Sequence, residues 1–176
     1  MKVTMVMLAT VDGKTTEGDN TNIYTWTSLE DQKYFFPLIN SYSVIVMGGK
    51  TYEAVRSILK LKENKLRIVL TRHPKKYSLQ TIKGQLEFSN EEPKQLVRRL
   101  SMIGYKKILL VGGSIINGLF LKDNLIDELY LTVEPKIFGK GKNIVEGQSL
   151  NKSLRLINIE KLNKEGTLLL KYKIKK

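Results

Sequence analysis

The pattern of apolar and polar positions predicts strands that alternate with helices along most of the chain. Short apolar or alternating runs, several of them rich in β-branched residues, predict strands at 2–9, 43–47, 66–70, 86–88 and 108–111. Apolar residues at helical spacing predict helices at 28–40, at about 50–59, at 91–103 and in a short stretch after 114. Because strands that alternate with helices build parallel sheets, this part of the chain is predicted to form an α/β sheet.

The end of the chain carries strand patterns without helices between them. Residues 127–134 alternate cleanly, with apolar side chains on one face and the polar Thr132 and Glu134 on the other. Two further strands are predicted at about 153–162 and 167–174, and their short connection is typical of an antiparallel hairpin. The predicted fold class is therefore α/β, with a mostly parallel central sheet and an antiparallel hairpin at its C-terminal edge.

The stretch 107–120 places glycines directly after the strand predicted to be most buried. Four apolar residues at 108–111 follow a lysine and precede Gly112 and Gly113, a pattern typical of a central parallel strand. Ser114 is expected to cap the following helix. Glycines at the carboxyl end of a strand let the backbone approach a ligand, and a helix start suits an anion such as a pyrophosphate. A plain tight turn explains the same residues equally well.

A second glycine pair, Gly48 and Gly49, ends the strand at 43–47 in the same way. Ligands of parallel sheets bind beyond the carboxyl ends of the strands. Two such turns favour an extended anionic ligand. The polar, glycine-bearing stretch 10–25 is long for an inert loop, and loops of this kind tend to carry function.

Length and composition indicate one soluble globular domain over 1–176. No apolar run approaches the roughly 18 residues that a membrane span needs, and the N-terminus has the pattern of a strand rather than a signal peptide. With no cysteine and a single histidine, His73, the chain excludes disulfides, thiolate chemistry and a structural zinc site, and no metal is expected. A cytoplasmic location without a membrane partner is the default expectation.

Positive charge dominates the ionisable residues. The chain has 30 lysines and arginines against 17 aspartates and glutamates, a formal net charge of +13. Such a charge attracts anionic ligands and would hold nucleic acid loosely. The lysines are scattered rather than gathered in one block, which favours a basic surface that keeps the protein soluble over a nucleic-acid interface.

Several short segments resemble the dihydrofolate reductase superfamily in their order and spacing. These segments are 26–35, 46–52, 68–72 and 111–113. Two others, 11–14 and 125–141, are more similar to the reductase domain of the bifunctional riboflavin-synthesis deaminase-reductase. Both families share one fold, and the resemblance runs from about residue 2 to 174. It implies a dihydrofolate reductase-like three-layer sandwich and an NADPH-dependent oxidoreductase.

The resemblance implies a set of NADPH contacts at the strand ends. Gly112 and Gly113 would face the pyrophosphate, with Lys50 and Thr51 assisting at the start of the second helix. Thr71 and Arg72 would hold the adenosine 2′-phosphate, for which a guanidinium is chemically apt. The other positions assigned to the cofactor are Ala9, Lys14, Gly48, Gly49, Val111, Ser114 and Ile115. A solvated arginine at 72 and an unliganded helix start at Thr51 remain the alternatives.

Asp31 is the predicted catalytic residue. In the folate enzymes the matching carboxylate hydrogen-bonds the pterin and assists protonation of the ring nitrogen while NADPH delivers hydride. Asp31 lies one helical turn before Phe35, and apolar surroundings such as Trp26 would raise its pKa by desolvation. The pattern Thr27-x-x-Glu30 fits a capping box, which would leave Asp31 free for chemistry. The alternative is that Asp31 only favours the helix start.

Four residues are assigned to the substrate by the same resemblance: Trp26, Phe35, Lys65 and Thr132. Trp26 would line the site near the nicotinamide, and Thr132 matches a threonine that supports the pterin site. Lys65 lies near the position of an arginine that holds the folate glutamate tail. Trp26 and Phe35 are equally compatible with core packing, and threonine is a common strand residue.

The sequence departs from both families. The folate enzymes usually carry arginine where Gly49 stands and proline where Thr25 stands, and Lys65 is a less directional partner than arginine. On the riboflavin side, the acidic Asp-Asp-Pro segment expected after Thr51 and the deaminase half are missing. The spacing of Trp26, Asp31 and Phe35 favours a folate substrate.

Three functions follow, in order of preference. The first is NADPH-dependent reduction of dihydrofolate to tetrahydrofolate or of a near relative. The second is reduction of the ribosylamino-pyrimidine phosphate intermediate of riboflavin synthesis. The third is a nucleotide- or nucleic-acid-binding module without chemistry. The sequence leaves open whether the protein is a monomer or a homodimer.

Overall fold

The computed structural model describes residues 1–175, which contain eight strands, four α-helices and two short 3-10 helices. The strands are β1 (Lys2–Thr10), β2 (Val44–Gly48), β3 (Leu66–Leu70), β4 (Leu86–Ser89), β5 (Lys107–Leu110), β6 (Glu128–Glu134), β7 (Leu154–Lys161) and β8 (Leu168–Ile174). The α-helices are α1 (Leu29–Asn40), α2 (Gly49–Val55), α3 (Pro93–Met102) and α4 (Ser114–Lys122). The 3-10 helices are η1 (Ile23–Thr25) and η2 (Pro74–Gln80).

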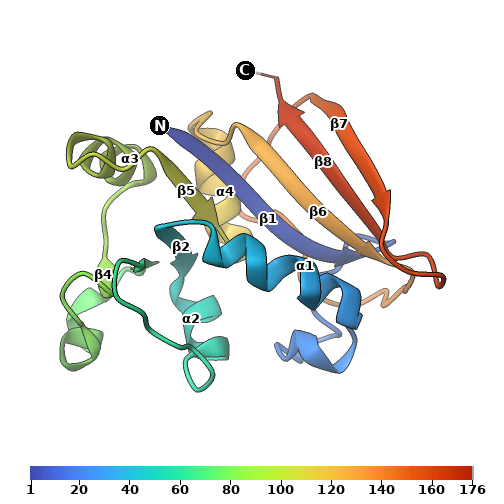
Figure 1. Cartoon of the computed structure of the whole chain (residues 1–176), viewed down its shortest axis with the longest axis horizontal. Coiled ribbons are helices and arrows are strands. Elements are labelled where there is room, and N and C mark those ends of the chain that lie inside the picture. Colours follow the sequence, from blue (N-terminus) through green and yellow to red (C-terminus); the bar gives the residue numbers. More distant parts are fainter. Residues whose placement is uncertain (176) are drawn as a thin grey trace.

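All eight strands belong to one mixed sheet with the order β4-β3-β2-β5-β1-β6-β8-β7. The pairs among β1 to β6 are parallel, whereas β8 runs antiparallel to both β6 and β7 (Figure 1). The α/β prediction, a mostly parallel sheet with an antiparallel C-terminal hairpin at its edge, is confirmed. The domain predicted over 1–176 ends on Lys176, which lies outside the described residues.

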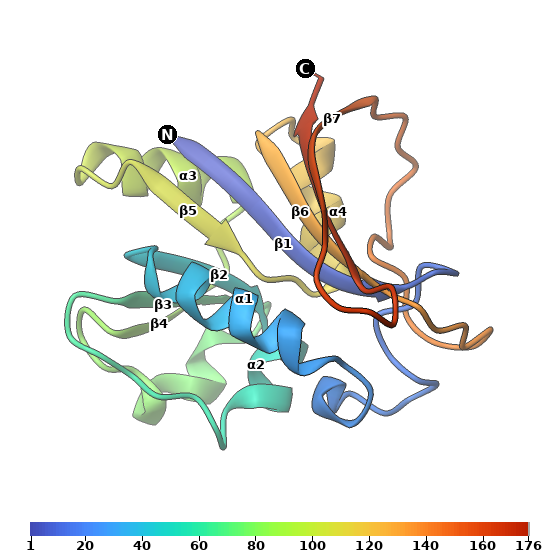
Figure 2. The same cartoon turned by 45° about the vertical axis from the view of Figure 1, so that its right-hand side comes forward.

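Helices lie on both faces of the sheet (Figure 2). Two apolar clusters of side chains fill the spaces between the sheet and these helices. One cluster includes Leu100 of α3 and Phe120 of α4, both fully buried. The other includes Tyr52 of α2 and Tyr77 of η2, with Phe35 of α1 packed against it. The molecule is thus a three-layer sandwich, in agreement with the expected architecture.

β5 is the central strand that its apolar run predicts. It pairs in parallel with β1 and β2, and Ile108, Leu109 and Leu110 are fully buried. Beyond the last paired residues the Gly48 N–H donates to the Gly112 carbonyl at 2.7 Å. The two glycine turns therefore lie side by side at the carboxyl ends of neighbouring strands, where a parallel sheet binds its ligands.

The helix predicted at about 50–59 is shorter than expected, because α2 ends at Val55. After Val55 the chain leaves the helix, and Leu59 and Leu61 pack against the cluster that contains Tyr52. The partial burial of these two side chains outside the helix offsets the loss of the last helical turn. The tertiary environment overrides the local helical pattern here.

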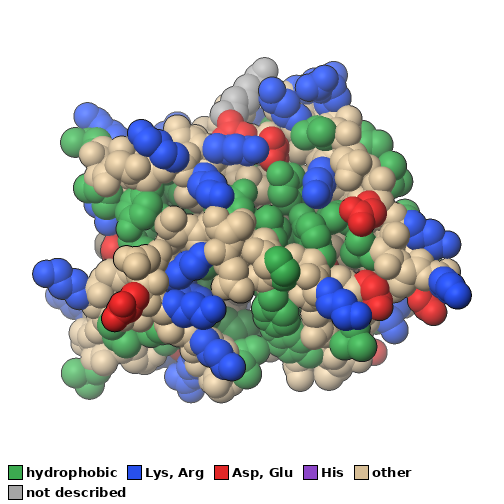
Figure 3. All heavy atoms as spheres, viewed as in Figure 1, with side chains coloured by type: hydrophobic (Ala, Val, Ile, Leu, Met, Phe, Trp, Pro, Cys, Tyr) green, Lys and Arg blue, Asp and Glu red, His purple; other side chains and the backbone are tan. Residues whose placement is uncertain are grey.

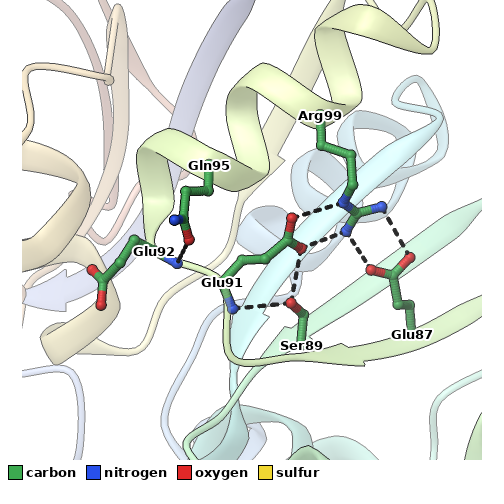
Figure 4. Close-up of polar contacts among 6 residues, drawn as sticks. All are labelled: Glu87, Ser89, Glu91, Glu92, Gln95 and Arg99. Atoms are coloured by element: carbon green, nitrogen blue, oxygen red, sulfur yellow. Dashed lines mark hydrogen bonds and ion pairs between the residues drawn. The ribbon is translucent and has the colours of Figure 1, made fainter.

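The two edges of the sheet differ. At the β4 edge, Ile82 exchanges two backbone hydrogen bonds with Leu86, at 2.8 and 3.0 Å. Arg99 reaches from α3 to Glu91 at 2.7 and 2.8 Å and also binds Glu87 on β4 (Figure 4). This hydrogen-bonded pairing holds the pKa of Glu91 below its usual value. At the other edge, all eight residues of β7 are exposed.

Candidate active site

Asp31 lies in the first turn of α1 with only 8% of its surface exposed. Burial raises its pKa to about 6; a hydrogen bond with the Thr132 hydroxyl opposes this rise, and the negative charge of Glu134 adds to it. A carboxyl with such a pKa can hold or release a proton near neutrality. The position and the electrostatics of Asp31 suit the proton-handling role that the sequence suggests.

The capping box predicted at Thr27-x-x-Glu30 is wrong. Ser28 is the N-cap of α1, and its Oγ accepts the Asp31 N–H at 3.2 Å. Ser28 can turn toward the helix because its own N–H and hydroxyl are fixed by the side chain of Glu134. The local pattern missed this arrangement because the partner lies on β6, far away in the sequence.

Glu134 is a site residue to which the sequence analysis assigned no role. It is 2% exposed, and its carboxylate accepts the Ser28 N–H at 2.8 Å, the Ser28 hydroxyl at 2.7 Å and the Thr167 hydroxyl at 2.7 Å. Thr167 in turn accepts from Asn163 at 2.9 Å. Glu134 thus ties the end of β6 to the start of α1 and to the β7–β8 turn. The sequence feature that indicates this role is the position of Glu134, a second polar residue after Thr132 at the carboxyl end of the same strand.

A cleft of about 510 Å³ opens between these three elements. Its lining residues include Trp26, Ser28, Glu30, Glu134, Lys136, Asn163 and Thr167. Trp26 is 6% exposed and packs edge-on against Phe138 with 5.1 Å between ring centroids. Its indole Nε1 has no hydrogen-bond partner among residues 1–175. Another hollow, of about 480 Å³ near Arg155 and Lys173, contains none of the predicted site residues.

The loop after β1 is paired with the loop after β6. Asp12 accepts the N–H groups of Phe138 and Gly139, and the Thr10 hydroxyl bonded to Asp12 lowers the pKa of this carboxyl. Lys14, expected at the cofactor, donates its ammonium to the Asn143 side chain at 2.8 Å. These contacts hold the loop after β6 in the position in which Phe138 packs against Trp26.

Close packing surrounds three of the four glycines at the strand ends. An added Cβ would come within 2.8 Å of Ile116 at Gly48 and within 3.1 Å of the Thr51 hydroxyl at Gly113. Gly112 has a φ of +88°, a conformation that favours glycine. At Gly49 a Cβ would make an ordinary 3.5 Å contact with Thr71, so this position has room for a side chain.

The start of α4 already carries a carboxylate. The predicted cap at Ser114 is wrong, because Gly113 is the N-cap and the Ser114 hydroxyl donates to Glu146 at 2.7 Å. This hydrogen bond lowers the pKa of Glu146, and the positive charges of Lys142 and Lys50 act in the same direction. An anionic ligand at this helix start would share those two lysines with Glu146.

The remaining cofactor candidates differ in accessibility. Lys50 and Arg72 are exposed, and Ile115 is 52% exposed. Thr71, at the end of β3, is half-buried and accepts the His73 N–H at 3.2 Å. Val111 is half-buried, and Ala9 is buried within β1.

Lys65 stands apart from the other substrate candidates. Its ammonium donates to the Tyr42 carbonyl at 2.9 Å and also to the Asn40 carbonyl, so it binds the C-terminal end of α1. It precedes β3, whereas Asp31, Thr132 and Glu134 gather near the carboxyl ends of the strands. Phe35 is half-buried against the cluster on the α1 face.

The described residues show neither a metal-binding cluster nor a helix that could span a membrane. In the described part of the chain, no group of three or more histidine, cysteine, aspartate or glutamate residues is arranged to hold a metal ion. The helices of residues 1–175 are too short or too polar to cross a membrane.

Solved structures with the same fold come from several bacteria. A putative riboflavin biosynthesis protein from Shewanella matches with a TM-score of 0.75 and 20% identity over all of both chains. A pyrimidine reductase-like protein from Corynebacterium diphtheriae matches with a TM-score of 0.76 and 14% identity, over 99% of this chain and 92% of that one. A Thermotoga maritima diaminohydroxyphosphoribosylaminopyrimidine deaminase/5-amino-6-(5-phosphoribosylamino)uracil reductase matches with a TM-score of 0.72 and 19% identity, over 98% of this chain and 56% of that one.

The chain is also similar in sequence to two further proteins and to one family model. A bifunctional dihydrofolate reductase-thymidylate synthase from Plasmodium vinckei is 33% identical over 94 residues, so the alignment covers 51% of this chain and 49% of that enzyme. The uncharacterised protein YyaP of Bacillus subtilis is 23% identical over 89% of this chain and 87% of its own length. The model of the RibD C-terminal domain matches residues 1–168. The chain therefore belongs to the RibD C-terminal domain family, a family of reductase domains.

Proposed function

We propose that the protein is an NADPH-dependent reductase of a ribosylamino-pyrimidine phosphate. The observation that carries the proposal is a buried carboxyl, Asp31, with a pKa raised to about 6 beside Thr132, in a chain of the RibD C-terminal domain family. The name of the Thermotoga relative includes a (phosphoribosylamino)uracil reductase. Dihydrofolate, the substrate preferred from the sequence, becomes the second candidate, supported by the partial Plasmodium match.

The strand ends fit a dinucleotide phosphate. Gly112 and Gly113 carry no side chain at the start of α4, and the Thr51 hydroxyl lies beside Gly113. Lys50 and Arg72 are exposed cations near the ends of β2 and β3, which suits phosphate binding. When bound there, NADPH supplies a hydride.

Asp31 supplies the proton that the reduction requires. A ring-opened ribosylamino group contains a carbon–nitrogen double bond, which accepts hydride at carbon and a proton at nitrogen. The Asp31 carboxyl would donate that proton to the nitrogen and become a carboxylate. Burial makes this carboxyl hold its proton to a higher pH than an exposed aspartate does.

The same acid could serve dihydrofolate, whose ring nitrogen also takes up a proton on reduction. The proton donor therefore does not distinguish the two candidate substrates. The groove that accepts the rest of the substrate distinguishes them. Trp26, Phe35 and the cleft bounded by Asn163 and Thr167 would select between a ribose phosphate and a folate tail.

The test is NADPH consumption with three additions: the ribosylamino-pyrimidine phosphate, dihydrofolate, or buffer alone. We expect rapid substrate-dependent oxidation with the pyrimidine and slow or no oxidation with dihydrofolate. Faster oxidation with dihydrofolate than with the pyrimidine would make dihydrofolate the substrate, and the proposed reductase activity would stand. If NADPH does not bind at all while oligonucleotides bind in a salt-sensitive way, the reductase proposal fails and the non-catalytic module replaces it.

A further inference from the structure

In the described part of the chain, Arg67 is a buried guanidinium without a counter-ion. It lies on β3 and is 7% exposed. Its Nε and Nη1 atoms are buried and have no hydrogen-bond partner among residues 1–175, and the side chain forms no ion pair in that range. Burial lowers the pKa of Arg67 below the usual value for arginine. Arginine stays charged nevertheless, and a buried charge is costly unless an anion compensates it.

The side chain of Arg67 points to the face of the sheet that α1 covers. Successive residues of a strand point to opposite faces. Ile68 belongs to the apolar cluster under α3 and α4, whereas Val69 belongs to the cluster on the side of α1 and α2. Arg67 therefore shares the face of Val69, at the amino end of β3. Lys107, the first residue of β5, stands two residues before Leu109 of the same cluster and points to the same face.

The charged side chains around Arg67 are lysines. Desolvation lowers the pKa of Lys65, and three positive charges lower it further: those of Lys62, Arg67 and Lys107. No acidic group of the described residues opposes this shift. Glu63, the acidic residue of the same loop, is exposed and takes part in none of the ion pairs within residues 1–175. The amino ends of β3 and β5 thus carry a concentration of positive charge around one buried guanidinium.

Tyr42, between α1 and β2, holds two of these lysines in place. The Lys107 ammonium lies 4.5 Å from the centre of the Tyr42 ring, and the Lys65 ammonium donates to the Tyr42 carbonyl at 2.9 Å. The Tyr42 hydroxyl donates in turn to the Thr4 hydroxyl at 3.0 Å. The fold therefore positions the lysines near Arg67, whose fork-shaped guanidinium can bind two oxygens of one anion.

This group of cations lies at the opposite end of α1 from the candidate active site. Asp31 is in the first turn of α1, whereas Lys65 donates to the carbonyl of Asn40, the last residue of the helix. A helix rises about 1.5 Å per residue, so these two points are roughly 14 Å apart. A small anion bound by Arg67 would therefore not touch Asp31.

We propose that Arg67, Lys65 and Lys107 bind a tetrahedral oxyanion, either inorganic phosphate or the phosphate group of a small ester. Water can accept the N–H groups of Arg67, but only an anion also compensates the surrounding positive charge. A dianion compensates more of that charge than a carboxylate does, and a guanidinium matches phosphate oxygens in a bidentate way. The bound anion would tie the amino ends of β3 and β5 to the end of α1. The inference does not depend on the proposed reductase activity.

Isothermal titration with inorganic phosphate at constant ionic strength tests the site. We expect the Kd to rise roughly tenfold or more in Arg67→Met and about threefold in Lys107→Met. Arg98→Met should stay within about twofold of wild type. Arg98 is the matched control, because it is an exposed arginine on α3, which packs on the other face of the sheet. Methyl phosphate distinguishes the two sources: tighter binding than inorganic phosphate indicates a phosphate ester, and weaker binding indicates the free anion.

Thermal unfolding gives an independent readout. In chloride alone, Arg67→Met should have a higher Tm than wild type, because a buried charge is replaced by an apolar side chain. Phosphate should then raise the Tm of wild type more than that of the variant. Phosphate also stabilises proteins in general, because it is excluded from their surface, and comparing the two proteins removes this effect.

A wild-type protein that binds no phosphate at the highest attainable concentration overturns the inference. Binding that is unchanged in both Arg67→Met and Lys107→Met overturns it as well. Loss of binding in Arg72→Met alone would assign the phosphate to the cations at the carboxyl ends of the strands and would also contradict the proposal. If Arg67→Met does not fold, Lys107→Met still decides, because Lys107 is exposed and its replacement leaves the core unchanged.

Discussion

At the scale of single residues, two buried carboxyl groups near the end of β6 have different environments, and of the two only Glu134 lines the cleft. Asp31 is buried with one hydroxyl partner, Thr132, and its pKa is raised to about 6. Glu134 is more deeply buried and accepts three hydrogen bonds from Ser28 and Thr167. Asp31 is thus the proposed proton donor, whereas Glu134 holds elements together and acts on Asp31 through its charge.

Asp31→Asn is expected to lower kcat/KM by roughly 10²- to 10⁴-fold, because the proposed proton donor is lost. In wild type, kcat/KM should fall as the pH rises through about 6, where Asp31 loses its proton, and the variant should lack this fall. NADPH oxidation measured across pH checks both. Exposed Asp19→Asn is the control, and an unchanged pH profile in Asp31→Asn would assign the proton to another group.

Asp31→Asn is expected to lower activity but to raise stability. The folded pKa of Asp31 lies above its unfolded value, so ionisation of the buried carboxyl destabilises the fold as the pH rises from about 4 to about 6. Asp31→Asn should therefore raise the free energy of unfolding by roughly 1–3 kcal/mol at about pH 7 and have little effect below about pH 4. Urea denaturation at both pH values measures it.

Glu134→Gln is expected to shift the fall in kcat/KM toward lower pH by roughly half a unit to one unit, because a negative charge that raises the pKa of Asp31 is removed. A purely structural role for Glu134 would lower activity at every pH without moving the profile. Glu165→Gln is the matched control, since this exposed carboxylate lines the same cleft at the β7–β8 turn.

At the scale of elements, the site depends on two loops that lie far apart in the sequence. The loop after β1 and the loop after β6 meet through the Asp12 and Lys14 contacts and through Gly141. Gly141 has a φ of +153°, and an added Cβ would come within 2.0 Å of the Thr16 carbonyl oxygen. The two loops can approach this closely only because position 141 has no side chain.

Gly141→Ala should therefore destabilise the protein by more than about 3 kcal/mol, because a strained backbone is combined with a backbone clash. Gly139→Ala in the same loop is the control. Gly139 has a φ of +66° with nothing within 4 Å of an added Cβ, so we expect a loss of about 1–2 kcal/mol. Chemical denaturation compares the two, and equal losses would contradict the close approach of the loops.

At the scale of the whole molecule, the net charge of +13 attracts anionic ligands from a distance. Lysine and arginine side chains are spread over the face in Figure 3 rather than gathered in one block. A field of this kind attracts any anion and is weakened by salt.

We therefore expect the Kd for NADPH to rise several-fold when ionic strength increases from about 0.01 M to about 1 M, where the screening length falls from about 30 Å to about 3 Å. The Kd for NADH should rise less, because NADH lacks the 2′-phosphate. Fluorescence titration of both cofactors measures the difference. Equal salt effects on the two would argue against a contact between the 2′-phosphate and a cation such as Arg72.

The sequence by itself determined the elements and the fold class of this protein. The patterns that predict these elements involve only residues close together in the sequence. They include the apolar run at 108–111, the alternation at 127–134 and the helical spacing of Asp31 and Phe35. Such patterns survive in any tertiary context that buries one face. The glycine turns at 48–49 and 112–113 belong to the same class, because a turn at a strand end is a local property.

Only the tertiary structure decided which side chains meet. Glu134 bonds to Ser28 across 106 residues and to Thr167 across 33, Ser114 turns to Glu146, and Lys65 binds the end of α1. These partners depend on the order of strands in the sheet. That order places the end of β6 beside the start of β8 and the start of α1, and it leaves β7 at the edge. Long-range order of this kind is set by the burial of the whole apolar core, which no single segment encodes.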